Sequence, residues 1–416
     1  MLKRTRNLFL IPGYPVFLSC MMLQGMAISI SSPFLAVYFT TKLGVSAGTF
    51  GIFTAITIIS GVWLSMWIAQ RSDSGLNRKK LMVTAMFFNA LAFAGYLLIH
   101  EFYGLLLYMA VFTALGAPAM PQLFASAREA VNASKSADHA FANSTLRSMF
   151  SLGFIAGPLA GSALIHYFGF PGIFMSTVLI FLMNALLIMI FVKAPAAPPQ
   201  TAGSKQQQRV RLLQNSRVLI PFLVLTLLYS GHWINNLNIS LFITDTLGGD
   251  TQNVASVSSI CALLEIPLML VLGLLSAKYS ARLLMVWGIA LGAAYYIVVL
   301  FSTSLWQILA GQVLLAFFVA VISAIGISYI QDLLPDLPGY ASTLYTNSTT
   351  IGRLFGSLAG ERRRSGSGTE TPIGYACCWE WSLWPCLHSP AFGGRRGHPF
   401  NQYHITGGIC NENHTC

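Results

Sequence analysis

The sequence is poor in charged residues, which make up only 9% of its 416 residues. A soluble domain carries about 25% charged residues, so this chain lacks the polar surface that keeps a soluble protein dissolved. Its hydrophobic content of 55% also excludes an intrinsically disordered chain. The alternating stretches of about 10 residues that form a membrane β-barrel are missing, because the apolar runs are continuous and about twice that long. At about 20 residues per span, the composition predicts an all-α polytopic membrane protein.

Acidic residues are also scarce, with 13 Asp and Glu against 24 Lys and Arg, which leaves a net charge of +11. Among the loops between apolar segments, every second one is cationic: residues 3–6, 71–80, 128–135, 193–217 and 278–282. The intervening loops contribute only Lys42 as a cation. The positive-inside rule places cationic loops in the cytoplasm. The asymmetry therefore predicts a cytoplasmic N-terminus, and the lipid bilayer explains the basic charge without a nucleic-acid partner.

Eleven apolar segments are long enough to cross a bilayer. We expect membrane spans at residues 15–40, 49–70, 81–100, 104–127, 141–166, 170–192, 218–244, 252–277, 283–302, 305–330 and 341–360. The segment between the sixth and seventh spans is rich in Pro, Gln and basic residues, which is typical of a flexible linker. The chain thus divides into an N-terminal six-helix bundle (1–192), a cytoplasmic linker (193–217) and a C-terminal bundle (218–360) with five recognisable spans.

Two short motifs recur in both halves. Asn143-Ser-Thr in the fifth span reappears as Asn347-Ser-Thr in the eleventh. Each is followed by glycines at four-residue spacing, which are Gly153, Gly157 and Gly161 in one half and Gly352, Gly356 and Gly360 in the other. Such glycines line one helix face and let two backbones approach closely. The two matches do not align without a gap, so they reflect either an internal repeat or chance. A 6+6 arrangement with repeated halves is typical of transporters.

Residues 361–416 break this pattern. They hold five of the seven cysteines (377, 378, 386, 410 and 416) and contain no segment of span length without Gly, Pro or charge. One interpretation is a Cys/His metal site or an extracellular disulfide module, but no CxxC or HxxxH spacing supports it. The other is a slip of the reading frame near Gly360, which makes the tail an out-of-frame product and removes a twelfth span. We expect no metal site and no cofactor.

The loop after the second span combines one acid, one glycine and a basic cluster, at Asp73, Gly75, Arg78, Lys79 and Lys80. Such a loop can cap helix ends, with the acid near a helix N-terminus, and can form salt bridges that latch the cytoplasmic side. We interpret these five residues as a cytoplasmic gating loop.

The loop resembles the signature of the major facilitator superfamily, from which it departs by an extra residue before Arg78. Longer strings resemble the bacterial sugar efflux transporters within that superfamily: RSDSGLNRKKL, AMPQLFASARE, LLEIPLM, YIQDLLP and STLYTNS.

The resemblance covers residues 15–360. It implies a major-facilitator fold in the bacterial inner membrane and export of small sugars or sugar analogues, such as lactose, glucose and alkyl thiogalactosides, by proton antiport. We expect the transporter to be a monomer. Two alternatives remain open: an exporter of another small molecule, such as a drug or an amino acid, and an inactive truncated transporter. The chain has no GxSxG elbow, HExxH motif or phosphate loop, so we do not expect an enzyme.

Polar residues inside the spans are candidates for a binding site, because they are costly in hydrocarbon and usually face a cavity or a partner. A sugar needs amide and hydroxyl partners and an aromatic surface, and the seventh span offers amides and an aromatic ring between Trp233 and Asn238. The substrate-binding candidates are Gln24, Asn89, Gln122, Arg147, His232, Trp233, Asn235, Asn236 and Asn347. For a single asparagine the alternative is an interhelical hydrogen bond, and for Arg147 it is snorkelling to the headgroups. The residues assign no role to Arg353.

Glu265 is the acid at the middle of the eighth span, too deep to reach either interface. Pro267 lacks an N–H and leaves the carbonyl of Leu263 unpaired, which can bend the helix beside the carboxylate. A protonated Glu265 suits an apolar setting, whereas an ionised one favours water, a cation or sugar hydroxyls. We predict that Glu265 carries the coupled proton. The alternatives are a neutral glutamic acid bonded to a neighbouring helix and a sugar ligand that carries no proton.

Reporter fusions test the orientation that the charge asymmetry predicts. A periplasmic phosphatase is active only outside the cytoplasm, so a fusion at residue 205 should be inactive and a fusion at residue 248 should be active. The reverse pattern of phosphatase activity would rule this orientation out.

Overall fold

The computed structural model describes residues 2–73, 76–134, 139–192 and 215–362, and the regular structure in these ranges is entirely helical. Gly75, most of the expected linker and the tail from residue 363 onward lie outside the described residues. The expectations of a metal or disulfide module, or of an out-of-frame segment, fall on that tail.

Each half of the chain is a succession of long helices. The first half contains α1 (Leu2–Phe9), α2 (Tyr14–Ser31), η1 (Ser32–Phe34), α3 (Leu35–Thr41), α4 (Ala47–Ser72), α5 (Arg78–Leu98), α6 (Phe102–Gly116), α7 (Ala119–Ala133) and α8 (His139–Phe191). The second half contains α9 (Ser216–Leu241), η3 (Phe242–Thr246), α10 (Thr251–Leu275), α11 (Ala281–Leu300), α12 (Leu305–Ala320), η4 (Val321–Ile325), α13 (Gly326–Leu333) and α14 (Pro338–Arg362). η1 is a 3₁₀ turn, and η3 and η4 are π-helical turns.

Nine helical segments in the described ranges are long and apolar enough to cross a membrane. One of them, α8, has 53 residues, which is about 80 Å of helix against a hydrocarbon thickness of about 30 Å. Its backbone leaves the helical conformation at Gly169, with φ 66° and ψ −163°, so α8 comprises two spans. α14 falls outside the nine but packs against α9, α4 and α7. With α8 divided and α14 included, each of the eleven expected spans is helical.

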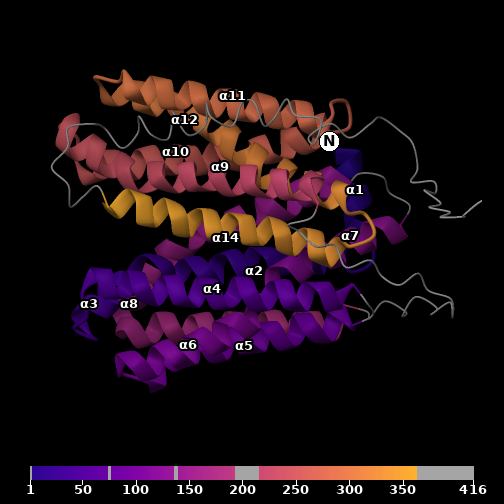
Figure 1. Cartoon of the computed structure of the whole chain (residues 1–416), viewed down its shortest axis with the longest axis horizontal. Helices are drawn as coiled ribbons and strands as arrows, with labels where there is room; N and C mark the ends of the chain where they lie inside the picture. The colour runs from indigo at the N-terminus through magenta and orange to yellow at the C-terminus, as the bar shows by residue number, and fades with distance from the viewer. Residues whose placement is uncertain (1, 74–75, 135–138, 193–214, 363–416) are drawn as a thin grey trace, which may run out of the picture.

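The helices run roughly side by side along the long axis of the molecule (Figure 1). In the first half, α8 packs against α2 and α5, and α6 packs against α4 and α5. In the second half, α9 packs against α14, and α12 packs against α10 and α11. The main contacts between the halves are those of α8 with α10 and of α14 with α4 and α7. Figure 1 shows α14 lying between α9 and α4, so this helix belongs to the boundary between the halves.

Glycines bring α2 and the first part of α8 into backbone contact. A Cβ atom at Gly153 would overlap the backbone oxygen of Met22, and one at Gly157 would overlap the hydroxyl of Ser29. From the other helix, a Cβ at Gly25 would overlap the backbone oxygen of Phe150. The glycine ladder in the fifth span therefore packs against the first span, as the four-residue spacing predicts for close helix pairs.

Substitution of Gly153 by alanine should destabilise the protein, because the new methyl group has no space unless α2 and α8 separate. Overpacking of this kind costs about 1–3 kcal/mol, so the detergent-solubilised Gly153→Ala variant should unfold several degrees below the wild type. Gly61→Ala is the matched control, since its Cβ would lie 3.5 Å from the Cβ of Ala117, an ordinary contact. Equal melting temperatures for the two variants would contradict this packing.

Candidate functional site

Two oppositely charged residues lie near each other across the boundary between the halves. Arg147 and Ser151 lie one turn apart on α8, and Ser151 donates a hydrogen bond to Glu265 Oε1 on α10 at 3.4 Å. The guanidinium of Arg147 interacts electrostatically with Glu265. We call Arg147, Ser151 and Glu265 the central cluster. It brings together two of the residues that the sequence singles out, one from each half.

The depth of the central cluster follows from the lengths of its helices. Glu265 lies ten residues before the end of α10, which is about 15 Å of helix, and its side chain is half-buried. On α8, Ser148 donates a hydrogen bond to the carbonyl of Ile266, also at 3.4 Å. α10 also contains Pro267, which removes one backbone donor. The two helices are therefore joined by polar contacts at Glu265 and Ile266, directly before Pro267.

A pair of tyrosines lies beside Arg147 and was not singled out by the sequence. Tyr345 on α14 donates a hydrogen bond to the carbonyl of Ser323 at 2.9 Å, and the hydroxyls of Tyr229 and Tyr345 are 2.9 Å apart. Because a hydroxyl has one proton, Tyr229 must donate to Tyr345. Both tyrosines lie near the guanidinium of Arg147. Ser323 lies in the π-helical turn η4, and π-helical turns are frequent at functional sites.

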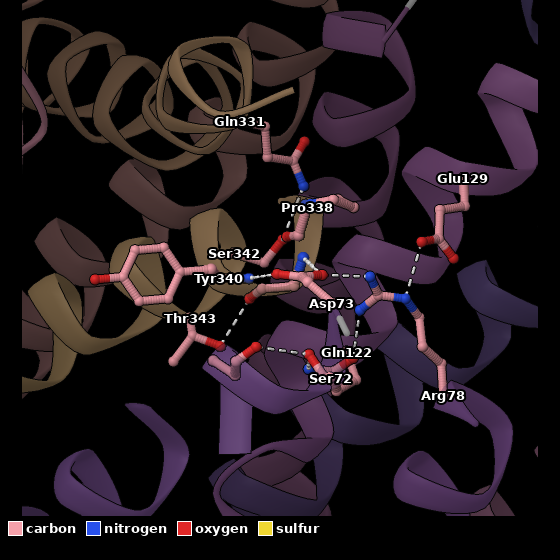
Figure 2. Close-up of polar contacts among 12 residues, drawn as sticks. Ser72, Asp73, Arg78, Gln122, Glu129, Gln331, Pro338, Tyr340, Ser342 and Thr343 are labelled. Carbon is pink, nitrogen blue, oxygen red and sulfur yellow. Dashed lines mark hydrogen bonds and ion pairs between the residues drawn. The ribbon is translucent and has the colours of Figure 1, made fainter. Parts of the chain in front are cut away.

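The end of the bundle that carries the loop after α4 is closed by a second set of contacts, centred on Asp73. Asp73 Oδ1 accepts the backbone N–H of Gly339 at 3.0 Å, and its Oδ2 accepts that of Tyr340 at 2.8 Å. Figure 2 shows this carboxylate between Arg78 and the first turn of α14. Free N–H groups and the helix dipole favour an anion at a helix N-terminus. A carboxylate from the first half thus caps a helix of the second half.

Arg78 holds Asp73 in place from the other side. Its guanidinium is an ion-pair partner of Asp73 and donates from Nε to Glu129 at 2.9 Å and from Nη1 to Gln122 Oε1 at 2.8 Å. Gln122 in turn donates to the hydroxyl of Ser72 at 3.2 Å. We call Asp73, Arg78, Gln122 and Glu129 the Arg78 network (Figure 2). The planar guanidinium uses each of its three nitrogens, which a lysine could not do.

The other predicted gating residues lie outside this network. Lys80 is exposed and Lys79 is half-buried, and neither has a described hydrogen bond from its ammonium group. Gly75 lies outside the described residues. The structure also places Gln122, a predicted sugar ligand, in the Arg78 network rather than beside the central cluster.

A further set of contacts joins the halves at the same end. Arg128 on α7 donates to Asp332 at 2.8 Å and to the side-chain oxygen of Gln331 at 3.2 Å. Asn143 at the start of α8 donates to the same oxygen of Gln331 at 2.8 Å, and Gln331 donates to Ser342 at 2.9 Å. The sequence alone suggests that Asp332 marks a solvated helix end; its side chain is 57% exposed, yet it is paired. These contacts, together with the Arg78 network, close this end of the interface.

Three other predicted ligands lie in helix contacts of the first half or of the boundary. Gln24 is buried on α2, and its Oε1 atom has no partner among the described residues. Asn89 donates to the carbonyl of Gly116 at 3.0 Å, a contact within the first half. Asn347 accepts a hydrogen bond from Ser65 at 3.1 Å and so joins α14 to α4.

The predicted ligands of the seventh span point in several directions. Asn235 is buried and accepts a hydrogen bond from Tyr295 at 3.3 Å, inside the second half. Asn236 is exposed. His232 and Trp233 are half-buried neighbours whose rings lie 6.4 Å apart, and Nδ1 of His232 has no partner among the described residues. The stretch from 233 to 238 therefore does not present its amides to one ligand.

These features are those of a membrane transporter with two helical halves, polar residues inside the spans and one end closed by polar contacts between the halves. The sequence profile of the Major Facilitator Superfamily matches residues 17–356. The chain is 30% identical over 347 residues to sugar efflux transporter A of Dickeya chrysanthemi, covering 83% of this chain and 87% of the relative. It is also 30% identical over 348 residues to sugar efflux transporter B of Salmonella typhimurium, with the same coverage.

The chain therefore belongs to the bacterial sugar efflux transporters of the major facilitator superfamily, and it is a transporter rather than an enzyme. Solved structures agree on the fold. The transporter FucP in its outward conformation superposes with a TM-score of 0.68 at 16% identity, covering 90% of this chain and 97% of FucP. The nucleoside transporter NupG gives a TM-score of 0.61 at 13% identity, covering 90% of this chain and 99% of NupG. The expected family and fold class are confirmed.

Removal of the charge on Asp73 should open the end that the Arg78 network closes. Loss of one partner of a buried ion pair costs about 3–5 kcal/mol, and Asp73→Asn also weakens the cap of α14. We expect spin labels at Lys80 and Lys278, one on each half, to show a larger fraction of long distances by pulsed electron paramagnetic resonance.

Asp336→Asn is the matched control for this measurement. Asp336 is an exposed acid two residues before α14, and it makes no hydrogen bond or ion pair with the described residues. Its neutralisation should leave the distance distribution unchanged. An Asp73→Asn variant with the same distribution as the wild type would show that this carboxylate does not hold the halves together.

Proposed function

We propose that this transporter exports small sugars from the cytoplasm in exchange for protons, with Glu265 as the carboxylate that carries the proton. Lactose, glucose and alkyl thiogalactosides are the proposed substrates. The relatives named as sugar efflux transporters support the substrate class. The observation that carries the coupling proposal is the central cluster, in which Glu265 faces Arg147 across the boundary between the halves.

The charge state of Glu265 can control the contact between α8 and α10. An ionised Glu265 is attracted to Arg147, which holds the two helices together at mid-span. Protonation removes that attraction and leaves Arg147 free to donate to sugar hydroxyls, because a guanidinium forms paired hydrogen bonds in a fixed plane. The protonated and ionised forms of Glu265 then favour opening to opposite sides of the membrane. Such a preference couples export of a sugar to uptake of a proton.

The proposed orientation places the Arg78 network at the cytoplasmic face, with the N-terminus on the same side. The cationic loops support this orientation. In this state the cytoplasmic end is closed by Asp73, Arg78, Arg128 and their partners. The structural likeness to FucP in its outward conformation fits such a state. Transport by a monomer then needs the two bundles, residues 1–192 and 218–360, to move relative to each other about the central cluster.

Sugar is proposed to bind where the central cluster meets the second half. Arg147 supplies donors there, and Tyr229 and Tyr345 lie next to it within a fixed hydrogen-bonded pair. Trp233 and His232 supply ring surfaces on the same helix as Tyr229. The predicted ligands Asn89, Asn235 and Asn347 bond to neighbouring helices in this state, which favours the interhelical role for them.

Glu265→Gln tests the coupling role, since glutamine keeps the shape of the side chain but cannot titrate. In proteoliposomes, the variant should still exchange labelled lactose for unlabelled lactose. Accumulation driven by a proton gradient should fall at least tenfold, and the pH dependence of exchange should flatten. Unchanged proton-driven accumulation would rule Glu265 out as the coupling group.

Glu101→Gln is the matched control, because Glu101 is an exposed acid directly before α6. It lies at the end of the molecule opposite the Arg78 network. This variant should accumulate sugar as the wild type does. Wild-type protein that transports none of the three proposed sugars, but transports an amino acid or a drug, would overturn the substrate class and leave the coupling test intact.

A further inference from the structure

A second arginine lies inside the membrane-spanning part of the second half, and no acidic residue in the described ranges pairs with it. Arg353 is in α14, 15 residues after its first residue, or about 22 Å along the helix. Among the residues that the structure describes, its one interaction is with the ring of Trp233 on α9, whose centroid lies 5.8 Å from the guanidinium carbon. Arg147 lies near Glu265, whereas the described part of the chain offers Arg353 no acidic counterpart.

The position of Arg353 on α14 directs it away from lipid. At about 100° per residue, the exposed Phe355 and Leu358 lie roughly 200° and 140° around the helix from Arg353. Tyr345, which contacts Tyr229 of α9, lies about 80° from Arg353 on one side of the helix. Asn347, which contacts α4, lies about 120° from Arg353 on the other side. Arg353 therefore lies on the face of α14 between its α9 side and its α4 side, towards the boundary between the halves.

The backbone contact of α14 with α9 fixes Arg353 and Trp233 relative to each other. A Cβ at Gly356 would lie 2.6 Å from the backbone oxygen of Ser230 and 2.7 Å from Cβ of Trp233. A Cβ at Gly352 would lie 2.6 Å from Cβ of Tyr229. The glycines on both sides of Arg353 thus set the helix separation at which its guanidinium reaches the indole ring.

The charge balance indicates what this pair can bind. An arginine in a membrane-embedded bundle is stable only beside water, a partner or a ligand, and the ring of Trp233 supplies part of that stabilisation. The N–H groups of the guanidinium donate to no described residue and so remain available to a planar anion. An indole ring also packs against the apolar face of a sugar.

We propose that Arg353 and Trp233 form a subsite for the anionic group of a sugar acid, meaning a sugar that carries a carboxylate or a phosphate. The proposal rests on the proposed function, because it names a substrate class for the same transport path. Arg353 lies eight residues beyond Tyr345, about 12 Å along α14. The anionic group of the substrate is held at this level, while its hydroxyls face Arg147 and the tyrosine pair.

Matched sugars test the subsite in proteoliposomes. Glucose, glucuronate and glucose 6-phosphate share one ring and differ in charge, so the ratio of kcat/KM for each anion to that for glucose measures the selectivity. We expect the wild type to favour at least one of the two anions over glucose. In the Arg353→Gln variant the ratio for that anion should fall at least tenfold.

Arg353→Lys keeps the charge without the planar fork and should retain an intermediate ratio. Arg217→Gln, at the exposed start of α9, is the control for surface charge and should keep the wild-type ratio.

Binding is measured separately with labelled glucuronate and labelled glucose 6-phosphate on the detergent-solubilised protein, after its melting temperature has shown that each variant is folded. Loss of anion binding in Arg353→Gln supports the subsite even if no sugar is transported, a result that would reject only the proposed function. A wild type that prefers glucose to both anions, or a folded Arg353→Gln variant with unchanged selectivity and binding, overturns the subsite. Inorganic phosphate that binds as tightly as glucose 6-phosphate would also overturn it, since the sugar ring would then contribute nothing.

Discussion

A charged side chain that is buried in a membrane protein needs a partner or water, and this constraint organises the boundary between the two halves. Arg128 pairs with Asp332 and Arg147 interacts with Glu265, each across that boundary. Asp73 is paired with Arg78 in its own half and caps α14 in the other. Lipid tails are as apolar as leucine, so burial of apolar surface drives the halves together only weakly. The polar contacts that neutralise these charges are therefore also the contacts that hold the halves in one relative position.

The helices within each half are held by a different means. Gly153 and Gly157 place α8 against the backbone of α2, and Gly352 and Gly356 place α14 against α9. Close backbone contact of this kind maximises dispersion and does not depend on charge. Proton or ligand binding can thus alter the contacts between the halves while the helix packing inside each half persists.

Much of this arrangement could be predicted from the sequence, because the strongest signals are local. Apolar runs of span length predict the helices, and the acid and basic residues of the 71–80 loop predict a latch. The partners of that latch could not be predicted, since Gln122 is 44 residues from Arg78 and the backbone groups capped by Asp73 are 266 and 267 residues away. A single glutamine in a span gives no indication of which helix it meets.

The contact between Tyr229 and Tyr345 also could not be predicted from the sequence. Tyrosines in apolar spans are typical of a packed core, and Tyr229 and Tyr345 are 116 residues apart. Ser323, the acceptor of Tyr345, lies in a π-helical turn that replaces the continuous helix expected at 305–330. A π-helical turn depends on tertiary contacts and has no composition of its own. The break of α8 at Gly169 was easier to place, because the sequence has a boundary between spans there.

The polarity of α14 has a consequence for how the protein is made. Its buried Ser342, Thr343, Thr346, Asn347 and Ser348 suit a helix enclosed by α9, α4 and α7, but they weaken its partition from the translocon into lipid. A segment of this kind enters the membrane efficiently only when helices synthesised earlier are already there to accept its hydroxyls and amides. Biogenesis of the second half is therefore cooperative, with α9 and the first half acting as the template on which α14 is inserted.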